Sequence, residues 1–352
     1  MSGETPPGQG VKGSNPLGNS PALPGAPPGQ GVKGFKSSRP IIMIHRLRLL
    51  VQHVSMVIML YGGRFGIRLG PGIPCFACPY VVGCGGQCYL MGLQGYYGFG
   101  LSFASLGGPL FFRALMWMAV FIGLTALLGK LWCGWICPFG LILDWLTGIR
   151  KALGVRERKF SPRLQKTLSP IKYILLAYAV ALPPLVTANI LSDGFFLPFC
   201  NICPGKSILP LFAGNASYFA LNFTNTVTLV FSILLLVITG VTLAGSFFKE
   251  RFFCYFCPLL ALMNLIKPIT MLRLTKQPLA CTGCASCRRS CPMNIDTVYL
   301  EKEKTDVQTG HCIDCFQCTE TCSARDALSV KFLGKRLFAA RRRYAAKRSI
   351  QR

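Results

Sequence analysis

Acidic residues and histidines are scarce in this chain. Its 352 residues include 12 Asp and Glu against 38 Lys and Arg, and only 3 histidines. No Ser-His-Asp or paired-carboxylate constellation can be assembled from so few residues, which argues against hydrolytic chemistry. The sequence also lacks a Gly-rich dinucleotide fingerprint, so direct oxidation of NAD(P) finds no support.

Charge of either sign is limited, whereas apolar residues are abundant. Charged residues make up 14% of the chain, hydrophobic residues 51%, and the mean hydropathy is +0.45. A chain of this length is then too apolar for a soluble protein, so we expect a membrane protein. The net charge of +26 does not indicate a nucleic-acid partner, because the basic residues lie beside hydrophobic stretches and in the tails. Membrane topology and anionic lipid explain them better.

Four apolar stretches are each close to the ~20 residues that cross a ~30 Å hydrocarbon core. They are Ile41–Tyr61, Leu110–Gly129, Leu168–Ile190 and Phe219–Phe247. The connection between the second and third stretches carries eight Lys or Arg, whereas the next connection has only Asp193 and Lys206 as charged residues. The positive-inside rule therefore predicts that both termini lie in the cytoplasm.

The two ends of the chain differ from the rest. Residues 1–38 contain the octamer PPGQGVKG twice within a Pro- and Gly-rich segment, which predicts a disordered tail, either a solvated linker or a docking element. Residues 331–352 contain nine Lys or Arg and no acid, interleaved with apolar residues. This tail is typical of a basic amphipathic helix on the inner leaflet, with a solvated end or an acidic partner surface as alternatives.

Eight cysteines near the C-terminus form two runs of spacing C-x2-C-x2-C-x3-C, in a domain that we place at residues 271–330. This spacing is that of bacterial two-cluster ferredoxins, in which the fourth cysteine of each run ligates the other cluster. Structural zinc sites rarely use three consecutive C-x2 spacings, and disulfide pairing would not explain why the same spacing occurs twice. We predict one [4Fe-4S] cluster on Cys281, Cys284, Cys287 and Cys322, and a second on Cys312, Cys315, Cys318 and Cys291.

Four further cysteine pairs, each followed by proline, accompany the apolar stretches as an internal repeat. If the two halves are parallel repeats about an axis along the membrane normal, the pairs meet at opposite faces. The cytoplasmic site is then Cys133, Cys137, Cys254 and Cys257, and the outer site is Cys75, Cys78, Cys200 and Cys203. Two such sites would lie ~30 Å apart across the bilayer, so conduction between them would need an additional carrier.

The occupants of the membrane sites stay open at this point. Thiolates select Fe–S clusters, zinc or Cu(I), but buried cysteines can also be inert, and an oxidising compartment favours disulfides. Cys84 and Cys88 offer another grouping with Cys75 and Cys78, which would leave Cys200 and Cys203 as a dithiol pair.

Polar side chains on the first apolar stretch are candidates for a quinone site. His45, Gln52 and His53 would be costly in a membrane helix unless they serve a function. The alternative is that the two histidines only sit at the interface. They cannot ligate one haem iron, because eight helical residues separate them by ~12 Å.

The run Leu131–Gly140 (LWCGWICPFG), its partner Phe252–Pro258 (FFCYFCP) and the double ferredoxin motif together resemble the NapH-type family of membrane-bound 4Fe-4S ferredoxin proteins, a family that includes part of NosR. The similarity covers about residues 40–330. The chain departs from the family pattern by a C-x2-C pair at Cys254, by extra cysteines near Cys84, and by its N-terminal tail.

The resemblance implies electron transfer between the quinone pool and a partner redox protein, as in anaerobic respiration, by a carrier or a quinol dehydrogenase subunit rather than a stand-alone enzyme. The expected fold is an α-helical membrane protein with four transmembrane helices in two parallel repeats over residues 39–270, plus a cytoplasmic α+β ferredoxin domain. The expected location is the inner membrane. Competing hypotheses are an assembly or copper-reducing factor and a redox-sensing regulator.

Overall fold

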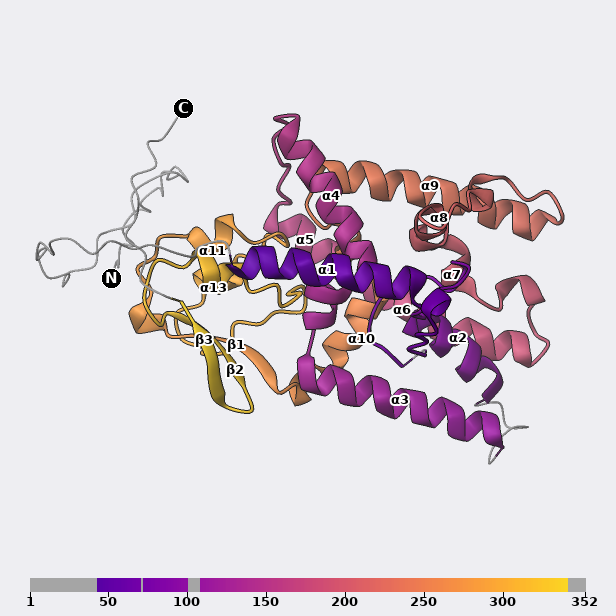
Figure 1. Cartoon of the computed structure of the whole chain (residues 1–352), viewed down its shortest axis with the longest axis horizontal. Helices are drawn as coiled ribbons and strands as arrows, with labels where there is room; N and C mark the ends of the chain where they lie inside the picture. The colour runs from indigo at the N-terminus through magenta and orange to yellow at the C-terminus, as the bar shows by residue number, and fades with distance from the viewer. Residues whose placement is uncertain (1–42, 71, 101–107, 341–352) are drawn as a thin grey trace, which may run out of the picture. The chain divides into compact units, whose positions relative to one another are not determined.

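The computed structural model describes residues 43–70, 72–100 and 108–340. The repeated octamer and residues 341–352 lie outside these residues. The described chain is a set of helices followed by a small domain with a three-stranded sheet (Figure 1). The elements are α1 (Met43–Tyr61), α2 (Tyr89–Gly100), α3 (Pro109–Leu128), α4 (Pro138–Ala152), α5 (Pro162–Leu168), α6 (Ile171–Thr187), α7 (Pro198–Ile202), α8 (Pro204–Leu211), α9 (Thr226–Phe248), α10 (Pro258–Ile266), β1 (Leu272–Lys276), α11 (Ser286–Arg289), α12 (Thr297–Leu300), α13 (Gln317–Thr321), β2 (Leu328–Phe332) and β3 (Lys335–Ala339).

Three helical stretches among the described residues are long and apolar enough to cross a membrane. They are α3, the stretch Arg163–Thr187 that contains α6, and α9. The helix α1 forms as expected from the first apolar stretch, but it is not among the three, because Arg46, Arg48 and two histidines interrupt its apolar surface. The prediction of a helical membrane protein is therefore confirmed, and the fourth span stays a prediction.

Proline after cysteine starts three of the shorter helices. Cys137, Cys203 and Cys257 are the N-cap residues of α4, α8 and α10, and the proline that follows each of them occupies the first helical turn. Proline suits this position because its missing N–H would have no helical partner there. Each Cys-Pro pair thus places a sulfur beside the free N–H groups of a helix start.

The C-terminal domain is built on the antiparallel sheet β1-β2-β3, in which Leu272 pairs with Phe332 and Phe332 with Lys335. The expected helix over residues 331–352 is wrong for residues 331–339, which form the β2-β3 hairpin. Leu333 and Gly334 both have positive φ, 49° and 78°, as a two-residue type I′ turn requires. This turn lets Lys331 and Phe332 continue β2, and it extends the domain past residue 330.

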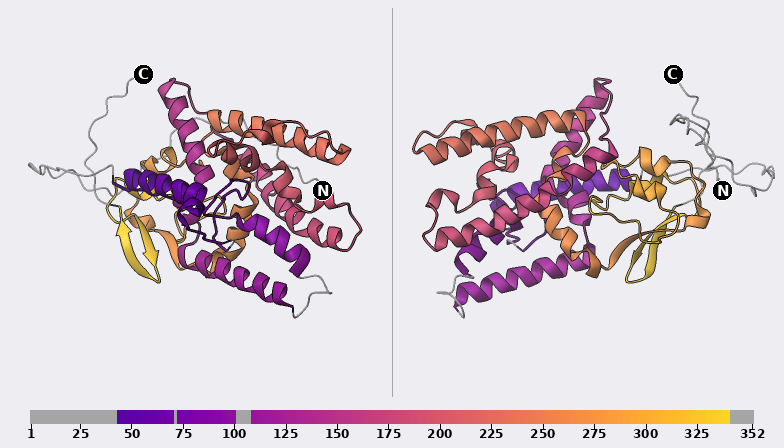
Figure 2. Two further views of the ribbon diagram at one scale, coloured as in Figure 1. Left: turned by 45° about the vertical axis from the view of Figure 1, so that its right-hand side comes forward. Right: turned by 180° about the vertical axis from the view of Figure 1, so that it is seen from behind.

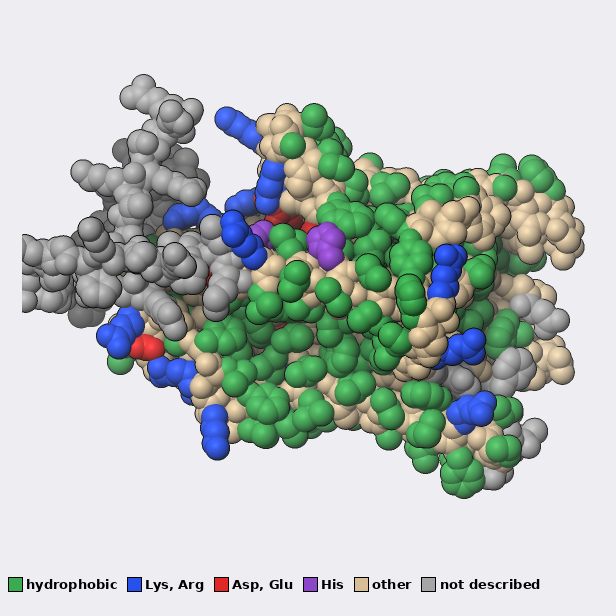
Figure 3. All heavy atoms as spheres, viewed as in Figure 1, with side chains coloured by type: hydrophobic (Ala, Val, Ile, Leu, Met, Phe, Trp, Pro, Cys, Tyr) green, Lys and Arg blue, Asp and Glu red, His purple; other side chains and the backbone are tan. Residues whose placement is uncertain are grey.

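The ferredoxin domain lies at one end of the membrane helices (Figure 2). The backbone N–H of Lys130, just after α3, donates to Asp314 Oδ2 over 3.0 Å, and Lys249 Nζ, just after α9, donates to the carbonyl of Pro292 over 3.2 Å. In the face seen in Figure 3, hydrophobic side chains form a band over the helices, between two margins where Lys and Arg gather. This pattern fits a membrane belt.

Candidate functional site

Seventeen of the eighteen cysteines line four cavities of similar size. The distal ferredoxin cavity, of about 340 Å³, contains Cys281, Cys284, Cys287 and Cys322. The proximal ferredoxin cavity, of about 420 Å³, contains Cys291, Cys312, Cys315 and Cys318, with Cys287 at its edge. The helix-end cavity, of about 390 Å³, contains Cys75, Cys133, Cys137, Cys254 and Cys257. The interior cavity, of about 310 Å³, contains Cys78, Cys88, Cys200 and Cys203. All these thiols are unpaired by disulfides.

The two ferredoxin cavities collect the cysteines in the crossed pattern that the spacing predicts. Cys322, from the second run, faces the cysteines of the first run, and Cys291, from the first run, faces those of the second. The two cavities share Cys287 and Val298 as lining residues, so they are immediate neighbours.

Cys284 is the exposed thiol of the distal cavity. Its sulfur lies 3.5 Å from Ser286 Oγ and 3.3 Å from Ser323 Oγ. Partial burial raises the pKa of Cys284, but these hydrogen bonds outweigh the effect, and the pKa lies at about 6. The thiolate is the form that binds metal. Ser323, which replaces a proline of the first motif, therefore has a role at this site that the sequence alone did not indicate.

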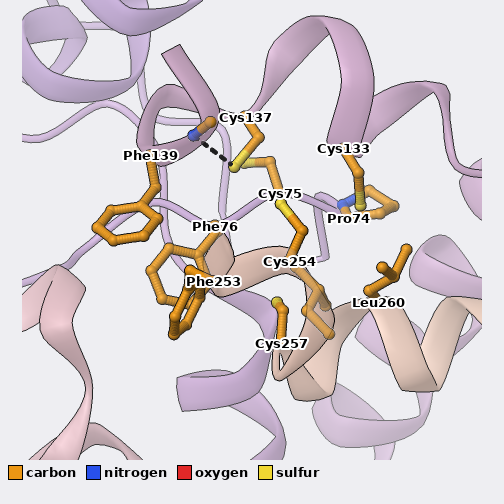
Figure 4. Close-up of a pocket in the computed structure, with 12 residues that line it drawn as sticks. Pro74, Cys75, Phe76, Cys133, Cys137, Phe139, Phe253, Cys254, Cys257 and Leu260 are labelled. Carbon is orange, nitrogen blue, oxygen red and sulfur yellow. Dashed lines mark hydrogen bonds between the residues drawn. The ribbon is translucent and has the colours of Figure 1, made fainter. Parts of the chain in front are cut away.

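The helix-end cavity brings together cysteines from three separate segments (Figure 4). Cys133 lies within a π-helical turn that ends at Cys137, just before α4, and Cys254 lies within the turn that precedes Cys257 and α10. The backbone N–H of Gly140 donates to Cys137 Sγ over 3.4 Å (Figure 4). The aromatic rings of Phe76, Phe139 and Phe253 form one wall, with centroids 4.9 to 5.5 Å apart.

A buried charge network supports this cavity. Arg251 is fully buried and donates to both oxygens of Asp144, over 2.8 and 2.5 Å, and to the carbonyl of Cys133 over 3.2 Å. Arg48 also donates to Asp144, over 2.6 Å. Two guanidinium groups against one carboxylate leave positive charge beside the thiols, which favours thiolates and the negative charge of a metal–thiolate centre.

The helix-end cavity abuts the proximal ferredoxin cavity. A methyl group at Gly134 would lie 3.2 Å from the backbone nitrogen of Cys315, and Trp135 Nε1 donates to the carbonyl of Asp314 over 3.1 Å. Two buried lysines hold the loop before Cys312: Lys130 Nζ donates to Thr309 O over 2.8 Å, and Lys172 Nζ to Gly310 O over 3.0 Å. The sequence does not predict this role for either lysine, because each is only a lone cation beside an apolar stretch.

The interior cavity differs from the expected outer site. The structure separates Cys75 from Cys78 and puts Cys88 in its place beside Cys200 and Cys203. The grouping of Cys75, Cys78, Cys84 and Cys88 does not form either, since Cys84 lines none of these four cavities and donates its S–H toward the carbonyl of Pro79. The structure brings the four cysteines of the expected cytoplasmic site together, but it divides the expected outer set, because α2 and α7 fold back between the long helices.

The interior cavity also lies deeper than expected. Ser207 of α8 hydrogen-bonds Thr239, near the middle of α9, over 2.7 Å, and Tyr89 stacks on Phe121, near the middle of α3, at 3.7 Å. Thr239 is nine residues, ~14 Å of helix, from the ferredoxin end of α9 at Phe248. In Figure 1, α8 lies beside the middle of α9. The residues that line the cavity are thus about half-way along the helices, so the expected ~30 Å gap between two membrane sites does not hold for this pair.

The three quinone candidates on α1 have different surroundings. Gln52 is fully buried and donates to Gly134 O over 3.2 Å and to Asp144 over 3.3 Å, so it belongs to the charge network. His53 has both ring nitrogens engaged, with Leu49 O at 2.7 Å and Trp145 Nε1 at 3.3 Å. His45 is exposed near the ferredoxin end of α1.

These cavities fit iron–sulfur clusters by the chemistry of their donors. Each offers four or more cysteine sulfurs, and the backbone donates to sulfur, as Ile295 N does to Cys291 Sγ over 3.5 Å. Within residues 43–70, 72–100 and 108–340, no group of His, Cys, Asp or Glu is arranged to hold a single metal ion.

Comparison with known proteins agrees with this chemistry. A model described as a 4Fe-4S binding domain matches residues 110–156 and 231–273, and one described as a 4Fe-4S dicluster domain matches residues 273–323. The uncharacterized protein MJ0750 of Methanocaldococcus jannaschii is 31% identical over 62% of this chain and 79% of its own length. The ferredoxin-type protein NapH of Haemophilus influenzae is 26% identical over 60% of this chain and 66% of its own length.

The chain belongs to the NapH-type family of membrane-bound 4Fe-4S ferredoxin proteins. The family resemblance drawn from the cysteine motifs is confirmed. Another relative, the putative electron transport protein YccM of Escherichia coli, is 24% identical over 61% of this chain but only 55% of its own length. No solved structure matches the chain. The family assignment makes this an iron–sulfur electron-transfer protein of the membrane.

Proposed function

We propose that this protein carries electrons between the quinone pool of the cytoplasmic membrane and a partner redox protein that docks on the ferredoxin domain. The observation that carries the proposal is the succession of thiol-lined cavities from the exposed Cys284 to the membrane helices. The distal and proximal cavities share Cys287, and the proximal and helix-end cavities meet where Gly134 contacts Cys315. Iron–sulfur clusters, when bound, supply one-electron transfer at potentials set by charge and hydrogen bonds to sulfur.

The proposed ligands follow from the cavities. Each ferredoxin cavity uses its four predicted cysteines. In the helix-end cavity, Cys133, Cys137, Cys254 and Cys257 are the proposed set, because they lie in the segments that match a 4Fe-4S binding domain. Cys75 lies outside those segments, and its sulfur donates toward Met59 Sδ over 3.7 Å.

We further propose that the ferredoxin domain faces the cytoplasm of the inner membrane. The basic connection between α3 and α6 supports this orientation, because it lies on the ferredoxin side of the helices. Arg158 N donates to Phe248 O at the end of α9, and Asn294 donates to the carbonyl of Phe160. The positive-inside rule places such a basic segment in the cytoplasm.

A partner protein is proposed to bind near Cys284. Arg288 and Arg289 belong to α11 beside this thiol, and Arg289 donates to the carbonyl of Cys284 over 2.9 Å. An acidic partner surface suits this edge of the domain. For the quinone, His45 and His53 are the candidates with exposed side chains, and His53 already has both ring nitrogens engaged, whereas Gln52 is buried in the charge network.

The test uses full-length protein purified without oxygen and placed in lipid nanodiscs with menaquinol or ubiquinol. We expect quinol to bleach the visible cluster absorption, or quinone to restore it after dithionite reduction. Cys137→Ala should abolish the reaction with quinol while dithionite still reduces the ferredoxin domain, and Cys84→Ala should behave as wild type. The proposal fails if dithionite reduces the wild-type clusters but neither quinol nor quinone changes their absorption.

A further inference from the structure

The interior cavity lies outside every segment that matches an iron–sulfur domain. The matched residues are 110–156, 231–273 and 273–323, whereas the cavity takes its thiols from Cys78, Cys88, Cys200 and Cys203. All four are buried, with less than a tenth of each side chain exposed. Four buried thiols from three segments thus line one cavity in the middle of the helices.

One of these thiols repeats the geometry of the helix-end cavity. Cys203 is the N-cap residue of α8, as Cys137 is of α4, and the sulfur of Cys137 accepts from the backbone N–H of Gly140 over 3.4 Å. Cys203 therefore also stands beside the free N–H groups of a helix start.

Another of these thiols, Cys200, has a side-chain donor. Gln94 is fully buried on α2, and its Nε2 lies 3.5 Å from Cys200 Sγ, while its Oε1 accepts from Phe199 N over 3.0 Å. The Cys200 sulfur thus accepts a hydrogen bond from a buried donor, as cluster ligands do. Lys206 also lines the cavity, with its Nζ 3.1 Å from Asn201 Oδ1, and adds a positive charge beside the sulfurs.

The cavity has the size of a ferredoxin cavity. The space between its lining residues, open solvent included, is about 310 Å³, against about 340 Å³ for the distal ferredoxin cavity. The remaining lining is largely apolar or aromatic, including Phe76, Leu90 and Phe199. Four sulfurs in an apolar shell, with the Gln94 N–H aimed at one of them, form the donor set of a cubane.

We propose that Cys78, Cys88, Cys200 and Cys203 hold a further [4Fe-4S] cluster in the interior cavity, next in line to the helix-end cavity. This extends the proposed function. The role of the cluster in electron transfer rests on that proposed function, but its presence in the cavity does not. It takes the succession of redox sites half-way into the membrane, the depth at which a lipid-soluble quinone moves.

Phe76 joins the two membrane cavities. Phe76 lines both cavities. The ring Cε1 lies 2.5 Å from where a Cβ at Gly205 would stand, so Gly205 must remain glycine for this approach. Cys75 and Cys78 bracket Phe76, and three residues of chain span at most ~11 Å. The two cavities are therefore neighbours.

The first test measures iron and acid-labile sulfide in full-length protein purified without oxygen. Four clusters of four irons predict about 16 irons per chain. The double variant Cys200→Ala/Cys203→Ala should lose about four irons relative to wild type, and Cys84→Ala should lose none. An unchanged iron content in the double variant overturns the proposal, and so does stoichiometric zinc or copper in wild type that the double variant lacks.

The second test keeps all the ligands. Gln94→Met removes the N–H donor to Cys200, and losing a hydrogen bond to sulfur lowers a cluster potential. Redox titration should show one cluster shifted to lower potential with the iron content unchanged, and no shift in any cluster counts against the proposal. Failure of the proposed function looks different: quinol would not react although the double variant still lost its four irons.

Discussion

Gly134 packs on the backbone of Cys315, joining the helix-end turn of the membrane part to a cysteine of the ferredoxin domain. A Cβ at Gly134 would lie 3.2 Å from the nitrogen and 3.3 Å from the Cα of Cys315, and closer still to the carbonyl oxygen of Ile313. Backbone cannot move aside as a flexible side chain can, so this contact fixes how closely the two parts approach.

Gly134→Ala should therefore weaken the docking of the ferredoxin domain. Overpacking of a tight contact costs ~1–3 kcal/mol, which thermal unfolding of the holoprotein in detergent will record as a lower midpoint. Gly148→Ala on α4 is the matched control, because its Cβ would meet nothing within 4 Å. Equal midpoints for the two variants would mean that the Gly134 contact is not close.

Asp144→Asn should be strongly destabilising. Asp144 neutralises the buried Arg251 and Arg48, and removing one partner of a buried ion pair leaves an uncompensated charge at a cost of ~3–5 kcal/mol. Asp326→Asn is the control, since Asp326 pairs with the exposed Arg336 and such surface pairs contribute ~0–1 kcal/mol. Denaturant unfolding of both variants beside wild type makes the comparison. If Asp144→Asn lost no more stability than the control, the buried charge network would not contribute to the stability of the fold as we describe.

Crossed ligation in the ferredoxin domain gives a paired prediction. Cys322→Ala should perturb the distal cluster, whose other ligands come from the first motif, and Cys291→Ala should perturb the proximal one. EPR of the reduced proteins will distinguish the two, because a different signal is lost in each variant. Loss of the same signal in both variants would contradict the crossed arrangement.

Cys75→Ala should retain the iron of wild type. Cys75 lines the helix-end cavity, but four other thiols there suffice for a cubane. Cys254→Ala should by contrast lose about four irons, because one of the four proposed ligands is gone. Iron analysis of the two variants decides whether Cys75 is a spectator or a ligand.

The sequence predicted the ferredoxin cavities well and the interior of the membrane part poorly, for a physical reason. The spacing of Cys281 to Cys291 is local, and a short loop can place its sulfurs in few ways. The partner of Cys78, in contrast, depends on how α2 and α7 pack between long helices, which no short-range pattern encodes. The sequence predicts that Cys75 and Cys78 act as one pair, but the two cysteines line different cavities.

The C-terminal hairpin shows a similar limit. The basic and apolar residues after Lys331 suggested a helix, yet Leu333-Gly334 makes a tight turn and β1 provides a strand for β2 to pair with. The tertiary partner, rather than the local pattern, decides the structure of residues 331–339.

The most direct measurement for the whole account is anomalous diffraction from anaerobically grown crystals, with data collected on both sides of the iron absorption edge. The account predicts iron in each cavity lined by cysteine, including the one formed by Cys133, Cys137, Cys254 and Cys257 between the helix ends. Iron confined to the ferredoxin domain, or zinc in the membrane cavities, would contradict it.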